Sequence, residues 1–239
     1  DYDVDGITAT SLLYRFLVKM GARVSYYIPE RQSEGYGLNL EALEHIISDG
    51  ASLVITVDCG ISSYDIVEAV CDRIDIIITD HHTAPPQIPP ARAVINHKQP
   101  DCPYTDKNLS GVGVAFKLCQ ALWLRQCGEW YLDDLDIVAL GTVADVVPLV
   151  GENRIIVQAG LKKMNELPNL GIDKLIDVAG LHDKTITAGH IGFTLAPRLN
   201  AAGRVTHATR AVELLVTDDV DLAETIAPVS YTHLRAHET

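Results

Sequence analysis

Positive charge is what this sequence lacks most. Its 239 residues include 19 Lys and Arg against 32 Asp and Glu, which gives a formal net charge of −13. Proteins that bind nucleic acid usually present a basic face, so this balance taken alone argues against such a role. The balance is compatible with an acidic centre that holds metal ions, because bound cations reverse the local field. A polyanionic substrate would then be held by metal ions and a few arginines.

Long apolar runs and paired cysteines are also missing. No run approaches the ~20 residues of a membrane span, and no signal peptide is visible. Because Asp1 is not a natural start, we expect the true N-terminus to lie upstream. The five cysteines are odd in number and form no C-x-x-C pair. We therefore expect reduced, buried thiols in a cytoplasmic protein without membrane contact, rather than a disulfide framework or a zinc site.

Strand and helix patterns alternate along the first part of the chain. Residues 53–57 and 75–79 are continuous apolar runs, which are typical of parallel strands buried on both faces. Residues 8–20 have helical periodicity, and 23–28 and 93–95 have the pattern of further strands. We expect an α/β fold with a mostly parallel sheet flanked by helices, followed by a helical region.

Three carboxylates stand at alternate positions in the first six residues, namely Asp1, Asp3 and Asp5. Alternate residues of an extended segment point to the same side, so we expect these carboxylates to crowd together at the end of a strand. Like charges that close raise one another's pKa unless a cation lies between them. The segment has some likeness to a calcium-binding loop, but Leu12 occupies the position where such a loop needs Glu.

Two more polar clusters follow the apolar strands directly. Asp58 comes after 53–57, and Asp80, His81 and His82 come after 75–79. Ligands of parallel sheets gather beyond the carboxyl ends of the strands, so we expect these clusters to lie at one edge. Each residue taken singly could be an ordinary turn or cap residue. The set of clusters is what predicts a common site.

The candidate metal ligands supply four carboxylates and one imidazole: Asp3, Asp5, Asp58, His81 and Asp145. Oxygen ligands suit Mg²⁺ and Mn²⁺, and Mn²⁺ also accepts imidazole. Two such ions ~4 Å apart can share one carboxylate, activate a water molecule and stabilise the leaving oxygen of a phosphoester. Asp58 is the expected bridge, and His82 could bind or protonate a phosphate oxygen.

Two glycine-containing segments leave alternatives open. Residues 111–116 look like a dinucleotide-binding fingerprint, but the third glycine is absent and no strand precedes them, so we interpret them as a tightly packed helix start. Arg198 and Arg204 are either ordinary surface charges or, beside Asn200 and Gly203, phosphate-binding groups. The residues from 228 to 239 lose the apolar periodicity abruptly, and we interpret them as a non-native tail.

The ordered set of motifs resembles the DHH phosphoesterase superfamily. Four of its motifs are matched in order by Asp-Tyr-Asp-Val-Asp-Gly (1–6), Val-Asp-Cys-Gly-Ile (57–61), Thr-Asp-His-His (79–82) and Val-Ala-Asp-Val-Val-Pro-Leu (143–149). Residues 110–117 and 197–204 are similar to the branch of single-strand-specific exonucleases. The resemblance implies a DHH domain over 1–150, whose first strand precedes Asp1, and a helical extension over 151–227 that leads toward a DHHA1 domain and an OB-fold.

The resemblance also implies an activity and a role for each residue. The activity is 5′→3′ degradation of single-stranded DNA in DNA repair and recombination, with two Mn²⁺ or Mg²⁺ ions and with a single-strand-binding protein or helicase as a partner of the longer protein. Asp58 and His82 would be catalytic, and the metal ligands would be those named above. Supporting residues would be Asp1 and Asp80, and DNA contacts would come from Arg198, Asn200 and Arg204.

Three functions therefore compete. The first is the single-strand exonuclease, which we expect to be weak or inactive in this chain alone. The second is a phosphoesterase of the same superfamily that acts on small molecules or oligonucleotides. The third is a non-catalytic scaffold, against which the complete ligand set argues.

Overall fold

Three parallel strands form the sheet in the computed structural model, which describes residues 3–29, 37–205 and 208–228. They are β1 (Leu53–Val57), β2 (Asp75–Thr79) and β3 (Ala93–Ile95), in the order β1-β2-β3. Val57 lies opposite Thr79, which in turn lies opposite Ile95, so the three strands end at the same level. The predicted α/β fold with a parallel sheet is confirmed.

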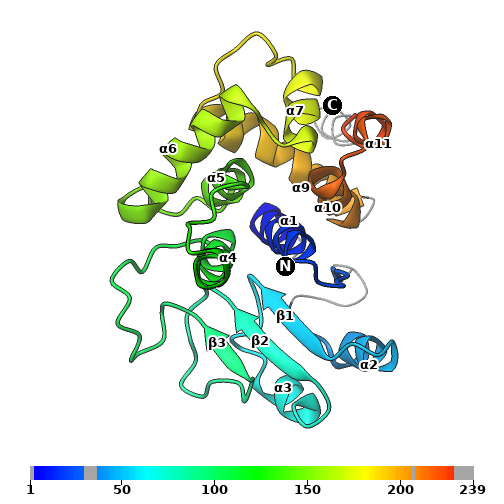
Figure 1. The fold of residues 1–239 in the computed structure, drawn as a ribbon, viewed down its shortest axis with the longest axis vertical. Coiled ribbons are helices and arrows are strands. Elements are labelled where there is room, and N and C mark those ends of the chain that lie inside the picture. Colours follow the sequence, from blue (N-terminus) through cyan, green and yellow to red (C-terminus); the bar gives the residue numbers. More distant parts are fainter. Residues whose placement is uncertain (1–2, 30–36, 206–207, 229–239) are drawn as a thin grey trace.

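The two faces of the sheet are covered by different helices. Helices α2 (Leu40–Ser48) and α3 (Tyr64–Val70) cover one face and share a small hydrophobic cluster with Ile76 and Ile78 of β2. Helices α1 (Val4–Lys19) and α4 (Gly111–Cys127) cover the other face, as Figure 1 shows. Burial on both sides explains why the strand sequences are apolar without alternation.

The second half of the chain is helical, as predicted. Its elements are α5 (Leu135–Ala144), α6 (Gly151–Glu166), α7 (Leu170–Val178), α8 (Ala188–His190), the π-helix η1 (Ile191–Leu195), α9 (Ala196–Val205), α10 (Ala208–Val216) and α11 (Val220–Ile226). Helix α1 packs against α4 and α5 on one side and against α10 on the other. A single hydrophobic cluster therefore joins residues from both predicted segments, and the boundary at residue 150 stays a prediction.

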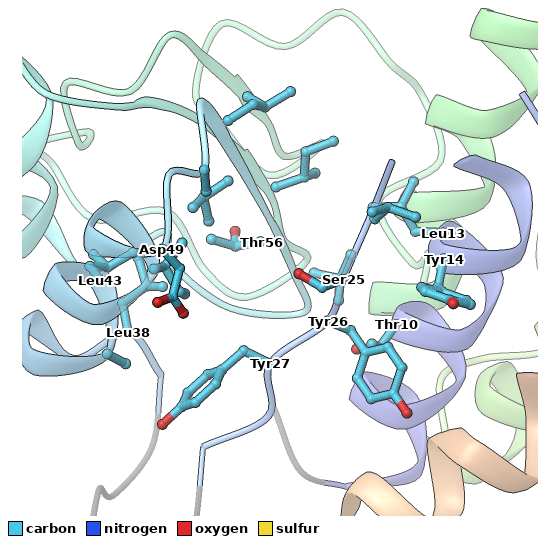
Figure 2. Close-up of a pocket in the computed structure, with 18 of the residues that line it drawn as sticks. Thr10, Leu13, Tyr14, Ser25, Tyr26, Tyr27, Leu38, Leu43, Asp49 and Thr56 are labelled. Atoms are coloured by element: carbon cyan, nitrogen blue, oxygen red, sulfur yellow. The ribbon is translucent and has the colours of Figure 1, made fainter. Parts of the chain in front are cut away.

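The segment 23–28 is not a strand, contrary to the prediction. Its side chains do alternate, with Val24, Tyr26 and Ile28 half-buried, and Tyr26 packs edge-to-face on Tyr14 at 5.3 Å. A strand also needs a hydrogen-bonded neighbour. Figure 2 shows Ser25 and Tyr27 across a cavity from Thr56 of β1, and this cavity of about 840 Å³ separates the segment from the sheet. The alternation of side chains thus agrees with an extended chain, but the segment is not paired with a neighbouring strand.

The cysteines are only partly as expected. All five are free thiols, but Cys119 alone is buried and Cys127 is exposed. Among the described residues, no helix is both long and apolar enough to cross a membrane.

Candidate metal centre

The carboxyl ends of β1 and β2 bring two of the predicted clusters together. Asp58 follows the last residue of β1, and Asp80 follows the last residue of β2, at matched register. Asp58 has a positive φ of 57°, which is uncommon for a residue other than glycine. Such backbone strain persists only where the surrounding structure enforces it, and it is concentrated at functional sites.

Asp3 and Asp5 enter the site from the start of a helix and not from the end of a strand. Helix α1 begins at Val4, four residues before the predicted start, and Asp3 is its N-cap, accepting a hydrogen bond from the Gly6 N–H at 3.0 Å. Asp5 lies in the first helical turn. Alternate residues point to one side only in an extended chain, so the predicted extended geometry is wrong for these aspartates, although the charge of Asp3 still acts on Asp58 and Asp145.

Asp5 is fixed by a helix that begins more than a hundred residues later in the chain. Its two carboxylate oxygens accept hydrogen bonds from the N–H groups of Gly111 and Val112, at 2.6 and 2.8 Å. These groups belong to the first turn of α4, whose N-terminus carries the positive end of the helix dipole. Asp5 is 1% exposed, so this contact holds a buried carboxylate at a defined position.

Asp145 is the remaining carboxylate among the predicted metal ligands. It is the C-cap of α5, and Val146, which follows it, has a φ of 59° that is strained for a β-branched residue. The motif 143–149 therefore begins in the last turn of a helix. The α5 helix packs on α1, so its end is held near the start of α1.

The imidazole of His81 lies among three carboxylates. Its Nε2 atom is 3.2 Å from Asp58 Oδ1 and 3.8 Å from Asp5 Oδ2, and its Nδ1 atom is 3.7 Å from Asp145 Oδ2. Among the described residues, two groups have ligand atoms close enough to hold a metal ion: Asp5 with His81 and Asp145, and Asp58 with His81 and His82.

Three buried atoms of this centre have no hydrogen-bond partner among the described residues. They are Asp58 Oδ1, His81 Nδ1 and Asp145 Oδ2. A buried polar atom without a partner costs about 1–3 kcal/mol, and more when it is charged. Oxygen and imidazole nitrogen are the donors that Mn²⁺ accepts, and Mg²⁺ prefers the oxygens. The donor set therefore fits a divalent cation, which would satisfy these atoms together.

Burial and the neighbouring carboxylates shift the pKa values of the residues in this centre. Burial, with the charge of Asp3 as the next contribution, raises the pKa of Asp58 to about 8. Burial also raises the pKa of Asp5 well above its usual value, and that of Asp145. Burial lowers the pKa of His81, which favours the neutral imidazole that a metal ion needs.

Asp80 supports the centre instead of joining it. Its Oδ1 atom accepts hydrogen bonds from the backbone N–H groups of His81 and His82 and lies 2.7 Å from His82 Nδ1, while its Oδ2 atom accepts from the Ile61 N–H. Burial alone would raise the pKa of Asp80, but these hydrogen bonds lower it below the usual value. The hydrogen bond to Asp80 raises the pKa of His82.

Gly111 is a site residue whose role the sequence did not reveal. A Cβ atom built on Gly111 would lie 2.6 Å from the Cβ of Asp58, a distance at which one of the two residues must move. Glycine is thus needed for the close approach of α4 to β1. The Gly-x-Gly pattern at the start of this helix was the available signal, and its interpretation as a tightly packed helix start agrees with the structure.

The remaining predicted residues are not brought into the centre by any described contact. Asp1 lies outside the described residues, as does the tail from 229. Arg198 and Asn200 are half-buried on α9, where the Arg198 guanidinium donates to the Thr194 carbonyl at 2.8 Å, and the side chain of Arg204 lies outside the described part. Their contact with DNA stays a prediction.

Fold and centre together define an α/β protein in which carboxylates and histidines converge beyond the ends of parallel strands. The chain belongs to the DHH family: the model described as "DHH family, N-terminal domain" matches residues 1–142. The family resemblance read from the motifs is therefore confirmed.

The relatives that the chain matches are exonucleases. It is 45% identical over 228 residues to the single-stranded-DNA-specific exonuclease RecJ of Bacillus subtilis, and 40% identical over 242 residues to that of Escherichia coli. Each alignment covers 95% of this chain but only 28% and 42% of the relative, so the chain spans less than half of their length.

Solved structures give the same result. The crystal structure of exonuclease RecJ bound to manganese superimposes with a TM-score of 0.90 at 35% identity, covering 100% of this chain and 60% of that one. RecJ from Thermus thermophilus in complex with Mn²⁺ has a TM-score of 0.84 at 33% identity and is covered over 34% of its length.

Proposed function

We propose that the chain carries the phosphodiesterase centre of a metal-dependent exonuclease that degrades single-stranded DNA from the 5′ end, in DNA repair and recombination. The observation that carries the proposal is the position of His81 among Asp5, Asp58 and Asp145, where three buried atoms have no hydrogen-bond partner among the described residues. The substrate is inferred from the similarity to single-stranded-DNA-specific exonucleases, and Mn²⁺ from the similarity to RecJ structures that contain manganese.

The residues divide into two overlapping ligand sets. In the proposed assignment, Asp3 serves one ion, Asp5, His81 and Asp145 serve the other, and Asp58 serves both. The second set coincides with one of the groups whose ligand atoms lie close enough for a metal ion. When bound, two such ions activate a water molecule and neutralise charge on the phosphate.

The side chains next to the ligands orient the substrate. We assign His82 to a non-bridging oxygen of the scissile phosphate, because its ring is half exposed and its Nδ1 atom is held by Asp80. Positive charge on His82 is favoured by its raised pKa, and a cation at this position stabilises a phosphate. Arg198, Asn200 and Arg204 are assigned to the DNA backbone, and Asp1 to support of the centre.

The proposed function also suggests a cellular location and a protein partner. We propose the cytoplasm as its location, where DNA is accessible and free thiols stay reduced. A single-strand-binding protein or a helicase remains the predicted partner of the longer protein.

A single-turnover assay tests the function. Excess chain is mixed with a 5′-labelled oligothymidylate, either single-stranded or annealed to its complement, with Mn²⁺ or with EDTA. We expect slow cleavage of the single strand that requires Mn²⁺, and loss of cleavage in the Asp58→Ala variant. The rate is expected to be low because the chain aligns with only 28% and 42% of the length of the two RecJ relatives.

Three outcomes would contradict the proposal. Unchanged turnover by Asp58→Ala would remove the metal centre from the mechanism. In a panel with pyrophosphate, cyclic dinucleotides and oligoribonucleotides, faster hydrolysis of any of these than of single-stranded DNA would favour the small-molecule phosphoesterase, and no hydrolysis at all would favour the scaffold.

A further inference from the structure

The loop that follows β3 lies beside the metal centre but contributes no ligand to it. Its first three residues are Asn96, His97 and Lys98, directly after the last residue of β3. The backbone N–H of Asp80 donates to the Ile95 carbonyl at 3.1 Å, so β3 leaves the sheet next to the Asp80-His81-His82 turn. The loop therefore begins at the same sheet edge as the centre.

Asn96 fixes the start of this loop to His82. It is 2% exposed, and its side-chain amide donates to the His82 carbonyl at 2.9 Å. Its side-chain oxygen accepts from the Lys98 N–H at 2.7 Å, which forms an Asx turn. One buried side chain thus holds the backbone of Lys98 at a fixed position relative to His82.

Other side chains hold the rest of the loop. The Gln99 amide donates to the carbonyls of Val94 and Asn96, both at 3.1 Å, and the Lys107 ammonium donates to the carbonyls of His97 and Cys102. A loop whose carbonyl groups are bound in this way is preorganised, so ordering it would add little cost to ligand binding.

His97 and Lys98 remain without a structural task. The His97 side chain is 5% exposed, yet neither of its ring nitrogens has a hydrogen-bond partner in the described part of the chain. Lys98 is exposed and forms no ion pair with a described residue within 4.0 Å. Most buried polar groups are paired, so an unpaired one calls for a specific explanation, of which a ligand is one.

The charge of Lys98 reaches the centre. It contributes, after burial and the nearer charges, to the pKa values of His81 and Asp145. Lys98 is thus an exposed cation on a loop that begins at the same sheet edge as the acidic centre. In a chain with a net charge of −13, such a cation is a rare means of holding a polyanion near the carboxylates.

We propose that the loop 96–98 is a phosphate-binding element, in which Lys98 contacts a backbone phosphate of the single strand next to the scissile one and Asn96 is the positioning residue. The inference rests on the proposed function, because it needs a strand with several phosphates. Asn96 ties this contact to His82, so the phosphate held by Lys98 and the phosphate held by His82 keep a fixed spacing.

Binding measured against salt tests the Lys98 contact. The affinity of the 239-residue chain with Mn²⁺ for a 5′-phosphorylated, phosphorothioate-linked oligothymidylate is measured by fluorescence anisotropy over a range of KCl. The variants are Lys98→Gln, the conservative Lys98→Arg, and Arg92→Gln as a control. Arg92 is an exposed cation at the opposite end of β3, next to Ala93.

Loss of one phosphate contact has a defined signature. We expect Lys98→Gln to bind the oligonucleotide about tenfold more weakly. The plot of the logarithm of the association constant against log salt should become less steep, its negative slope losing about 0.7 in magnitude. Lys98→Arg should keep the slope, and Arg92→Gln should leave both quantities unchanged. A merely structural effect would weaken binding without changing the slope, and equal slopes in Lys98→Gln and the wild type would overturn the inference.

The Asn96→Ala variant tests the positioning role. It removes the donor to the His82 carbonyl and the acceptor for the Lys98 N–H without adding a charge. We expect the single-turnover rate to fall while oligonucleotide affinity changes little, and an unchanged rate would remove Asn96 from the proposal. Hydrolysis of bis(p-nitrophenyl) phosphate, which has no neighbouring phosphate, separates the two proposals. Lys98→Gln should lower it less than it lowers cleavage of the oligonucleotide, whereas absence of this hydrolysis in the wild type would count against the proposed function itself.

Discussion

Two buried aspartates of this molecule have opposite electrostatic surroundings: one is paired with a cation of the chain, and the other lies beside a further carboxylate. Asp58 in the metal centre is 1% exposed and Asp134 beneath the helical region is 4% exposed. Asp134 accepts from the Arg15 guanidinium at 2.9 Å and from the Tyr131 hydroxyl. Asp58 instead faces Asp3, whose charge contributes after burial to its raised pKa, and its Oδ1 atom has no hydrogen-bond partner among the described residues.

The difference separates a structural charge from a functional one. A buried carboxylate paired with arginine is complete within the chain, although its net contribution to stability is small after the cost of desolvation. The charge of a buried carboxylate placed among other carboxylates is neutralised only when a cation binds. The metal-free chain is therefore destabilised at the sheet edge, as is common where function needs strained or repelling groups.

The largest effect is expected at the close contact between α4 and β1. Gly111→Ala places a methyl group against Asp58 and should displace it, lowering single-turnover cleavage about 100-fold, since a misplacement of ~1 Å can cost that much. Gly113→Ala is the matched control, because its Cβ would lie no closer than 3.4 Å to the nearest side-chain atoms, those of Leu109 and Ser110. Equal rates in the two variants would show that the contact does not position Asp58.

The second effect concerns the paired aspartate. Arg15→Met leaves Asp134 buried without a cation and should lower the free energy of unfolding by about 2 kcal/mol, below the roughly 3–5 kcal/mol of a fully buried pair because Arg15 is partly exposed. Denaturation by urea measures it. The double variant Arg15→Met, Asp134→Asn should recover part of the loss, and a double variant less stable than Arg15→Met would contradict this account.

The third effect should have the opposite sign. Asp58→Asn removes a repelling charge, so the metal-free protein should become more stable by about 1 kcal/mol. A carboxyl group whose folded pKa lies above its unfolded value loses stability as pH rises through the folded pKa, so the gain should be largest above pH 8. Thermal unfolding with and without Mn²⁺ checks this.

Mn²⁺ should raise the melting temperature of the wild type more than that of Asp58→Asn. If Asp58→Asn destabilised the metal-free protein, Asp58 would not be a repelling charge and would not differ from Asp134 in the way described above.

The smallest effect is a pH dependence of stability at His97. Burial, followed by the nearby charges of Lys98, His81 and Lys107, lowers its pKa, while the backbone of Lys107 and the charge of Asp106 act in the other direction. The unfolded state then binds more protons, so stability should fall as pH drops below about 6.5.

His97→Gln should reduce this loss by up to about 1 kcal/mol per pH unit. His45→Gln, at an exposed position on α2, is the control. Parallel stability curves for the wild type and His97→Gln between about pH 7 and 5 would exclude the effect.

Much of the fold could be predicted because it depends on local pattern. Apolar runs at 53–57 and 75–79 indicated both main strands, helical periodicity over 8–20 indicated most of α1, and the glycine pattern at 111–116 indicated the start of α4. The segment 23–28 was misassigned because a strand depends on a partner as well as on alternation. The start of α1 was missed because the caps and acidic residues of a first turn resemble the polar end of a strand.

The sequence by itself determined which residues could form a metal centre, and the tertiary structure decided how they meet. The alternation of elements predicts parallel strands, whose carboxyl ends lie at one edge of the sheet, so Asp58 and His81 were expected to share that edge. Asp5 is held at that edge by the N–H groups of Gly111 and Val112, which donate to its carboxylate from more than a hundred residues further along the chain. The Asx turn of Asn96 with Lys98 is local, but the hydrogen bond that joins Asn96 to the His82 carbonyl is tertiary. No local pattern encodes the contacts of Asp5 or the contact of Asn96 with His82.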